Sequence, residues 1–291
     1  MQNYKRLSIA VTFMVALLLP FSAVALDIVS QPVAEAPLLD GTGFDAAWQT
    51  VKPIAIKDHS GTIILLRSVH TDDSVYFLAQ FQDLADNLLH KPWVWDKEKN
   101  SYALGPHRED TFVFKWNMMD HPVNLSNFSD DDYRADVWYW KANRTNPAGY
   151  ADDKTHLLGS QSAKKATVTS SPAGKQRYLQ RISDAGKAPY TEYEPADFER
   201  DIVDHYNPVA PDGSRGDVHA KGNWVGGIWT IEFERKLNTG HEDDVQFDLQ
   251  AKTPYLFGVS MFSLYGKPHD PDSPNFYGRG KISEPLYLSL K

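Results

Sequence analysis

The sequence predicts an all-β protein, an antiparallel β-sandwich with long irregular excursions and a few short helical turns. Three observations support this prediction. Short runs of β-branched and aromatic residues alternate with polar residues, as half-buried strands do. The 18 glycines and 18 prolines are spread along the chain and supply its turns. Apolar residues at helical spacing never continue beyond about three turns. Many short strands separated by frequent turns are typical of a sandwich.

Residues 1–25 have the pattern of a signal peptide. Lys5 and Arg6 precede an apolar run, and Ala23-Val24-Ala25 forms a small-x-small cleavage site. The apolar run is shorter than the roughly 20 residues that span a bilayer. We therefore expect a periplasmic protein that is cleaved after Ala25 and has no membrane span afterwards. Residues 26–291 are expected to form a single domain.

The composition excludes several classes of function. The chain has 30 basic and 38 acidic residues, a net charge of −8. Two basic residues and no acidic ones are lost with the signal peptide, which leaves −10. An acidic domain without basic clusters is not expected to bind nucleic acid. Because the chain has no cysteine, it has no disulfides, cysteine nucleophiles, iron–sulfur clusters or covalently attached haem.

The first predicted elements lie in the N-terminal third. Phe44–Val51 is expected to form a short amphipathic helical turn that carries Trp48 inward. Thr62–His70 and Val75–Gln82 alternate with period two on either side of a four-residue turn, which predicts a β-hairpin. Asp83–Gly105 lacks this alternation, and we expect a loop that holds two exposed or half-buried tryptophans.

The central and C-terminal strands follow. Thr111–Trp116 and Asp136–Lys141 are expected to be aromatic strands. Residues 160–222 show poor periodicity and are interpreted as a long excursion with short strands such as Ala166–Ser170. This excursion is expected to cover a site or contact a partner. Regular alternation returns in four segments: Asn223–Arg235, Val245–Leu249, Tyr255–Phe262 and Pro285–Leu290.

Motifs of hydrolases, metalloproteases and nucleotide-binding proteins are absent from the sequence. Acids are grouped at 130–132, 152–153 and 242–244, so the sequence leaves open a glycosidase pair or, at 130–132, calcium ligands. Each group lies beside turn residues, where acids are usually solvated or cap the turn, and that is our expectation. Among the ten histidines, His70 and His269 are the best candidate ligands.

The stretch from Glu109 to Asp153 is the most distinctive part of the chain. It places Met118 and Met119 in a loop after an aromatic strand. Soft sulfur ligands beside flat aromatic side chains suit a flat, metal-bearing cofactor. Methionines also fill gaps in a core, and tryptophans are usually buried, so packing is the alternative explanation for both.

Several segments resemble the haem-binding domain of the γ subunits of ethylbenzene dehydrogenase and dimethylsulfide dehydrogenase, and of their stand-alone periplasmic relatives. They are VYFLAQFQD, KPWVW, EDTFVFKW, DVWYWKANRTNPAGYADD, WTIEFERKLNTGHEDDVQF and YLFGVSMF, in family order over most of residues 60–265. The run DVWYWKANRTNPAGYADD is the most specific. Some relatives carry a Cys-x-x-Cys-His-like insertion for a second haem, where this chain has Ser126-Asn127-Phe128-Ser129.

The resemblance implies a sandwich that holds one haem b without covalent attachment, through an axial methionine and an axial lysine or histidine. It implies an electron-transfer protein rather than an enzyme, with a redox partner such as a molybdenum enzyme or a cytochrome. The implied iron ligands are Met118 or Met119, together with Lys281 or its alternatives Lys267 and His269. The implied pocket walls are Trp116, Trp138 and Trp140, and the implied propionate partners are Arg144 and Arg279.

A function of another class is also compatible with the sequence. The DG…W pattern from Asp40 to Trp48 and the many aromatic residues would suit a secreted carbohydrate-binding module of the family-nine type, without a cofactor. An adhesion or assembly subunit that binds through residues 160–222 is a third interpretation. An absorption spectrum separates the first function from the other two.

Overall fold

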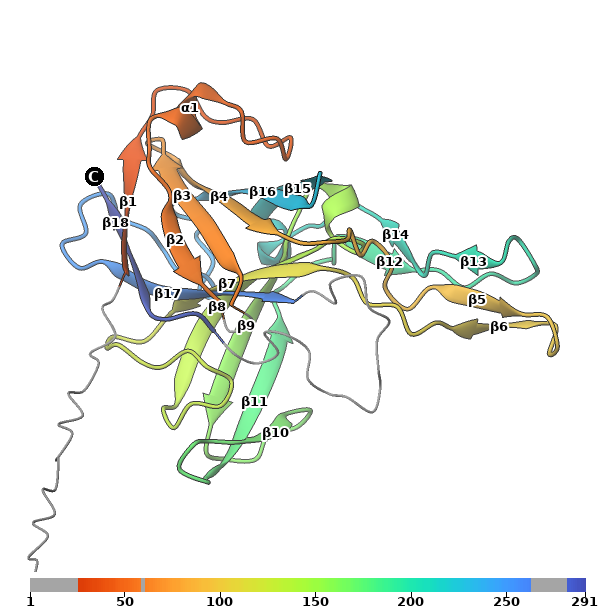
Figure 1. Ribbon diagram of the computed structural model, residues 1–291. Coiled ribbons are helices and arrows are strands. Elements are labelled where there is room, and N and C mark those ends of the chain that lie inside the picture. Colours follow the sequence, from red (N-terminus) through yellow and green to blue (C-terminus); the bar gives the residue numbers. More distant parts are fainter. Residues whose placement is uncertain (1–25, 59–60, 263–281) are drawn as a thin grey trace, which may run out of the picture.

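The computed structural model describes residues 26–58, 61–262 and 282–291. Within these residues, strands make up nearly all of the regular structure, with one short α-helix and two 3-10 helices (Figure 1). The all-β fold class is therefore confirmed. The predicted signal peptide lies outside the described residues. No helix in the described part of the chain is long and apolar enough to cross a membrane.

Most of the strands form two sheets that are joined through β1 (Leu26–Pro32). The first half of β1 pairs in parallel with β18, and Gln31 and Pro32 pair in parallel with β3, so one strand belongs to both sheets. All other strand pairings in the two sheets are antiparallel. Sheet A has the order β10 (Thr167–Ser170), β11 (Gln176–Ser183), β9 (Asp152–Gly159), β8 (Tyr133–Lys141), β7 (Thr111–Asn117), β17 (Tyr255–Phe262), β18 (Leu286–Leu290), β1. Sheet B has the order β1, β3 (Ile63–His70), β4 (Ser74–Gln82), β16 (Ile228–Lys236), β15 (Val218–Val225), with β2 (Ile54–Lys57) on β3.

Aromatic side chains fill the space between the two sheets. Alternate residues of β7 point inward, because successive side chains of a strand face opposite sides. Phe114 of sheet A therefore meets Phe77 and Phe233 of sheet B, with ring centroids 4.9 and 5.0 Å apart. Each ring is fully buried, and burying a side chain of this size contributes about 1.5–3 kcal/mol. The interior of the sandwich is thus a continuous aromatic core.

The predicted helical turn over residues 44–51 is present as α1 (Ala46–Gln49). Trp48 is 1% exposed, as expected, and its Nε1 donates to Glu232 Oε1 at 2.8 Å. The other oxygen of Glu232 accepts from the backbone N–H of Gly41 at 2.7 Å. Gly41 has φ +78°, and a Cβ there would lie 2.9 Å from Asn223. This turn needs glycine, so the DG…W pattern is explained by packing onto sheet B.

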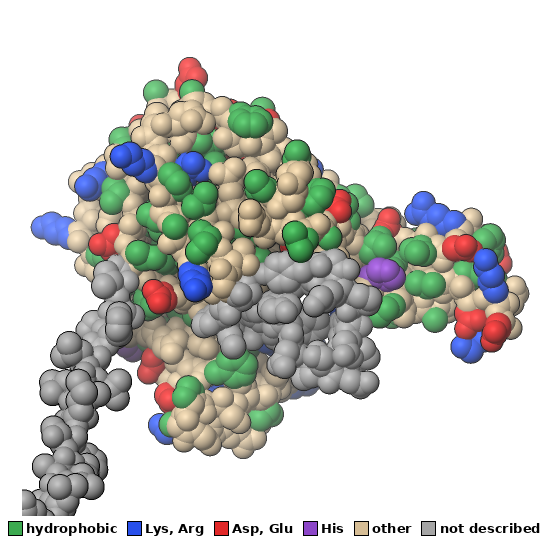
Figure 2. All heavy atoms as spheres, in the orientation of Figure 1, with side chains coloured by type: hydrophobic (Ala, Val, Ile, Leu, Met, Phe, Trp, Pro, Cys, Tyr) green, Lys and Arg blue, Asp and Glu red, His purple; other side chains and the backbone are tan. Residues whose placement is uncertain are grey.

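The predicted loop at residues 83–105 is wrong in part. β5 (Trp93–Asp96) and β6 (Ser101–Leu104) form a hairpin, and β13 (Ile202–Val203) extends it into a three-stranded arm that stands away from the body (Figures 1 and 2). β5 is half-buried on both faces and β6 is mostly exposed, so neither strand shows a clear alternation. Trp95 packs edge-on against Tyr102 and Phe198 at 4.9 and 5.0 Å.

Residues 160–222 are more regular than predicted. β10 and β11 extend sheet A, β12 (Tyr190–Glu192) pairs with β14 (Tyr206–Pro208), and β15 already belongs to sheet B. These strands are mostly exposed on one face or both, so their sequences carry few apolar residues. Asn223–Arg235 is likewise two strands, β15 and β16, which reverse at Gly226 and Gly227 with positive φ.

Val245–Leu249 is not a strand, contrary to the prediction. The segment is held by single hydrogen bonds instead of a ladder: Val245 N donates to Asp136 Oδ2 at 3.0 Å, and Phe247 N donates to Leu237 O at 2.7 Å. Both side chains are buried in the core between the sheets. Residues 237–247 therefore close one side of the sandwich, and their apolar character comes from this packing.

Candidate functional site

The loop between β7 and β8, residues 118–132, is here called the methionine loop. Asn117, the last residue of β7, shapes its first turn: its side chain accepts from Met119 N at 3.1 Å and donates to His121 O at 2.8 Å. Met118 N donates to Arg134 O at 3.1 Å, and Arg134 N donates to the Met119 thioether sulfur at 3.3 Å. Both methionines are half-buried.

The methionine loop lies over an apolar cluster on the outer face of sheet A, the face turned away from sheet B. We call it the outer cluster. Met119 packs against it, and so do Ile282 and Tyr287 from the C-terminal segment. The buried members of the outer cluster are Val113, Val123, Leu125, Tyr133, Ala135, Val137, Leu158, Leu179 and Leu256.

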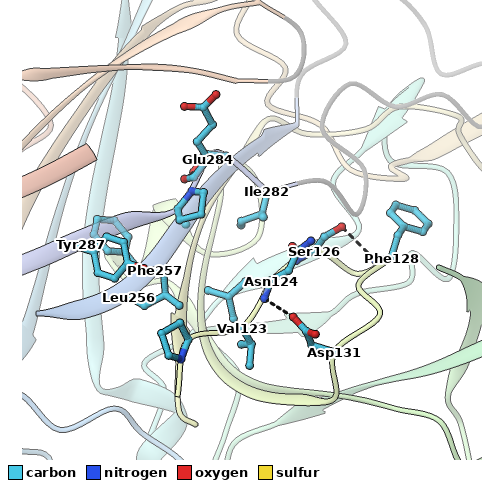
Figure 3. Close-up of a pocket in the computed structure, with 15 residues that line it drawn as sticks. Val123, Asn124, Ser126, Phe128, Asp131, Leu256, Phe257, Ile282, Glu284 and Tyr287 are labelled. Carbon is cyan, nitrogen blue, oxygen red and sulfur yellow. Dashed lines mark hydrogen bonds between the residues drawn. The ribbon is translucent and has the colours of Figure 1, made fainter. Parts of the chain in front are cut away.

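A cavity of about 700 Å³ lies between the methionine loop, β17 and the segment that leads into β18 (Figure 3). Most of its lining is apolar, and Val123, Leu125 and Leu256 belong to the outer cluster. Among the described residues, two charged ones line the cavity, and both are acidic: Asp131 and Glu284. The other lining residues are Pro122, Asn124, Ser126, Phe128, Phe257, Gly258, Ile282, Ser283, Pro285 and Tyr287.

Hydrogen bonds define two walls of this cavity. In the methionine loop, Asn124 N donates to Asp131 Oδ2 at 2.8 Å, which closes the loop on itself (Figure 3). On the opposite side, the Ser283 backbone N donates to Val259 O at 2.8 Å, and Val259 N donates to Ser283 Oγ at 3.0 Å. The segment that leads into β18 is thereby attached to β17.

Of the predicted iron ligands, the structure describes Met118 and Met119, both in the methionine loop. Met119 packs against the cluster that forms the cavity wall. Lys281 lies outside the described residues, but it directly precedes Ile282, a lining residue. His269, Lys267 and Arg279 also lie outside the described residues. The structure thus brings the methionine loop next to the residue that follows Lys281, and the ligand assignment itself stays a prediction.

The three predicted tryptophan walls are core residues. Trp116, Trp138 and Trp140 are 0% exposed and lie between the two sheets. None of them is among the described residues that line the cavity. Phe257 connects the two regions, because it lines the cavity and stacks on Trp116 with centroids 4.4 Å apart.

A residue that sequence reasoning missed lies beneath the methionine loop. Lys115 of β7 is 3% exposed, and its Nζ is 2.9 Å from Asn127 Oδ1 and 2.5 Å from the Tyr133 hydroxyl. Asn127 stands between two lining residues, so Lys115 helps to hold the cavity wall. Burial lowers the pKa of Lys115 well below 10.5. A lysine at an outward position of a strand is usually solvated, so the sequence carried no signal for this role.

His156 of β9 lies on the same face. It is 6% exposed, and burial, reinforced by Lys115, lowers its pKa well below 6.5. The other histidine candidate, His70, is 3% exposed at the end of β3, and its Nδ1 lies 3.2 Å from Ser30 Oγ. His70 therefore has a packing role at the junction of the two sheets.

Arg144 lies at the other end of the β7–β8 hairpin, about 20 Å from the start of the methionine loop, as seven residues of strand require. It forms an ion pair with Glu109, which is 5% exposed and also accepts from the backbone N–H groups of Asn143 and Arg144. Burial and the Arg144 charge lower the pKa of the adjacent His90 to about 2. Arg144 is thus committed to a structural ion pair.

Asp152 forms a second network at the same end. Its buried carboxylate receives Lys141 at 2.5 Å, Lys154 at 3.0 Å and Arg215 at 2.7 Å. Burial opposes ionisation, but these cations hold the pKa of Asp152 far below 3.8. Burial lowers the pKa of Lys141 to about 7 against the attraction of Asp152. Arg215 comes from the excursion, so this network attaches the excursion to sheet A.

The prediction that the acidic groups are solvated is correct at 130–132 and at Glu242, which are exposed, but wrong at 152–153 and at Asp244. Asp152 and Asp153 are 0% exposed, and Asp244 is 4% exposed. At 130–132, Asp131 is bonded within the methionine loop and Asp132 pairs with Arg177. Turn residues do flank these acids, but neighbouring strands and the excursion cover the groups at 152–153 and 244.

Comparison with known proteins gives one family and a distant set of structures. The family described as ethylbenzene dehydrogenase matches residues 45–270. No curated protein matches the chain. A family 9 carbohydrate-binding module from Caldicellulosiruptor kristjanssonii in complex with glucose aligns with a TM-score of 0.38 and 11% identity, over 91% of this chain and 96% of that chain. A second structure of the module, with cellotriose, has a TM-score of 0.38 and 9% identity, over 92% and 94%. Similarity at this level carries no conclusion about ligands.

Proposed function

This chain belongs to the ethylbenzene dehydrogenase family, and on that premise we propose that it is an exported electron-transfer protein that binds one haem b without covalent attachment. The observation that carries the proposal is the apolar cavity between the methionine loop and the segment that begins immediately after Lys281. The methionine loop and the segment that follows Lys281 are more than 150 residues apart in sequence, but they meet at this cavity. Each of them could therefore supply one iron ligand.

The cavity suits a flat, mostly apolar group. Its volume of about 700 Å³ falls within the range of roughly 300–1,000 Å³ that is usual for cofactor sites. Val123, Leu256 and Ile282 offer apolar surface from three separate segments of the chain. Such a lining favours the binding of a mostly apolar group.

Met119 is the methionine that we assign to the iron, because its side chain packs against the cluster that forms the cavity wall. A thioether is a soft, neutral ligand that favours ferrous iron. We assign the opposite position to Lys281, with His269 as the alternative. A lysine ligand must be neutral, so it requires a desolvated site such as this apolar cavity. When bound, the haem would supply one-electron exchange.

The charges around the cavity help to choose between Arg144 and Arg279 as partners of the haem propionates. Among the described residues, the charged side chains that line the cavity are those of Asp131 and Glu284, which would repel the haem propionates. Arg144 is paired with Glu109 at the far end of the hairpin, so its position does not suit this cavity. We therefore assign the propionates to Arg279. With Met119 and Lys281 both bound to the iron, neither oxygen nor a substrate would reach it, and the protein would exchange electrons with a redox partner.

Absorption spectra of the purified protein, oxidised and dithionite-reduced, test this proposal. We expect a Soret band and a low-spin reduced spectrum after expression with ample haem. Met119→Ala and Lys281→Ala should each disturb the low-spin spectrum, whereas Met118→Ala, the adjacent control, should leave it unchanged. A colourless protein that takes up no haem on reconstitution would contradict the proposal. An unchanged spectrum in both ligand variants would contradict the ligands alone.

A further inference from the structure

A second buried cluster lies on the opposite face of sheet A from the cavity. Asp136 of β8 and Asp153 of β9 point inward toward sheet B, where Arg235 of β16 meets them. Asp244 reaches the same place from the segment that closes the side of the sandwich. All four side chains are at least 96% buried.

Arg235 forms ion pairs with two of the three carboxylates, those of Asp136 and Asp244. Its guanidinium lies 3.3 Å from Asp136 Oδ2 and 2.9 Å from Asp244 Oδ2. Asp136 Oδ2 also accepts from Trp138 Nε1 at 3.2 Å and from Val245 N at 3.0 Å. In both Asp136 and Asp244, the Oδ2 atom is therefore well bonded by the protein.

The third carboxylate is not explained by this ion pair. Asp153 is 0% exposed, and the hydrogen bond to its side chain comes from the neighbouring Lys154 N, at 3.1 Å to Oδ1. Its Oδ2 has no hydrogen-bond partner, and neither does Oδ1 of Asp136 or Oδ1 of Asp244. Buried carboxylate oxygens are strongly destabilising unless something neutralises them.

The spacing and charge of the cluster fit a divalent cation. A ligand oxygen from each of the three aspartates lies within 4.8 Å of the other two. Calcium–oxygen bonds of about 2.3–2.6 Å place ligand oxygens up to roughly 5 Å apart, whereas magnesium requires a smaller cage. Three carboxylates and one guanidinium leave two negative charges, which one divalent cation neutralises.

We propose that Asp136, Asp153 and Asp244 bind a calcium-type divalent cation that ties sheet A, sheet B and the 237–247 segment together. Asp184 offers a further oxygen nearby: it is 5% exposed, its Oδ1 accepts from Thr155 Oγ1 at 3.0 Å, and its Oδ2 has no hydrogen-bond partner. The role is structural, and it does not depend on haem binding.

A proton shared between carboxyl groups is the competing occupant of this cluster. Burial raises the pKa of Asp153 well above 3.8 and that of Asp136 to about 6, so without a cation the cluster would retain protons near neutral pH. A bound cation and a shared proton lead to opposite expected effects when the Asp153 charge is removed. A cation site loses affinity, whereas a proton-sharing cluster is relieved of repulsion and becomes more stable.

Calcium titration of the EDTA-treated full chain tests the proposal. We expect one calcium ion per chain by calorimetry. The Tm should rise by about 5 °C or more when calcium is near 100 times its Kd. Terbium should bind at the same place and emit on excitation of tryptophan, since Trp138 Nε1 is 3.2 Å from an Asp136 oxygen. Calcium should abolish that emission by displacement.

Asp153→Asn should weaken calcium binding at least about 10-fold, because it removes one charged ligand. Glu242→Gln, an exposed acid of the same segment, is the matched control and should bind calcium like the wild type. The proposal is overturned if the wild type shows neither calcium binding nor tryptophan-sensitised terbium emission. It is also overturned if Asp153→Asn binds calcium as tightly as the wild type, or is more stable than the calcium-loaded wild type. If Asp153→Asn does not fold, the wild-type terbium displacement decides the question.

Discussion

The two ends of the β7–β8 hairpin differ in what their residues do. At one end, the methionine loop encloses an apolar cavity above sheet A, with Lys115 beneath it. At the other, Glu109–Arg144 and Asp152 with its three cations form buried ion pairs. The segment that most specifically resembles the family, DVWYWKANRTNPAGYADD, ends at the ion-pair end. A specific motif can therefore belong to the framework of a fold, while the candidate site lies beside a less distinctive loop.

Asn146 illustrates the framework role of this motif. Its side chain accepts from Trp140 Nε1 at 3.1 Å and from Gly222 N at 2.7 Å, and it donates to Gly222 O at 3.0 Å. One side chain thus joins the core of sheet A to the edge strand of sheet B. Three predictions test the contrast between the two ends, beginning with the largest expected effect.

Asp152→Asn should reduce the free energy of unfolding by about 3–5 kcal/mol, because it leaves the buried Lys141 without its counter-ion. Urea unfolding followed by tryptophan fluorescence measures the change. Asp212→Asn is the control, since its pair with Lys187 is exposed on both sides and should not matter. A loss as small in Asp152→Asn as in Asp212→Asn would mean that the ion-pair end does not hold the fold.

Two glycines permit a matched comparison of rigidity at the two ends. A Cβ at Gly222 would lie 2.4 Å from Trp140, which is fixed by Asn146. A Cβ at Gly258 would lie 2.4 Å from Ile282, which borders the cavity and has space to move. We expect Gly222→Ala to cost about 3 kcal/mol and Gly258→Ala about 1 kcal/mol. Equal losses in urea unfolding would show that the cavity end is as rigid as the core.

Lys115→Met should change how stability depends on pH. The folded-state pKa of Lys115 lies below 10.5, so between these two values the unfolded chain binds more protons than the folded one. The contribution of this lysine to stability therefore rises with pH up to about 10.5 in the wild type, by at most about 1.4 kcal/mol per pH unit. Lys115→Met lacks this rise.

Urea unfolding from pH 7 to pH 10 measures the difference between the two slopes. At pH 7 the variant should lose only about 1–2 kcal/mol, because Asn127 and Tyr133 each lose a hydrogen-bond partner. Lys187→Met, which removes an exposed lysine, is the control and should retain the wild-type slope. Parallel slopes for Lys115→Met and the wild type would refute the burial of a neutral amine under the methionine loop.

The strands with strong alternation were predictable from the sequence. β3, β4, β7, β8 and β17 match their predicted ranges within three residues, and Trp48 is buried in the predicted helix. The arm was missed because strands that are exposed or half-buried on both faces carry little periodic signal. β11 was missed because one of its two buried positions is a charged residue, Arg177. At the candidate site, Met118 and Met119 lie in a loop between two aromatic strands, as predicted, and the roles of the predicted site residues stay predictions.

The sequence by itself determined the fold class, the family and the order of the main strands, because alternation and turn chemistry are local properties of the chain. Only the tertiary structure decided which polar residues are buried. The sequence predicts that Lys115, Asp152 and Asp153 are exposed. In the folded chain they are buried, because a loop, the excursion and a second sheet cover them. Their environment comes from segments that are distant in sequence, and that environment sets their charge and their partners.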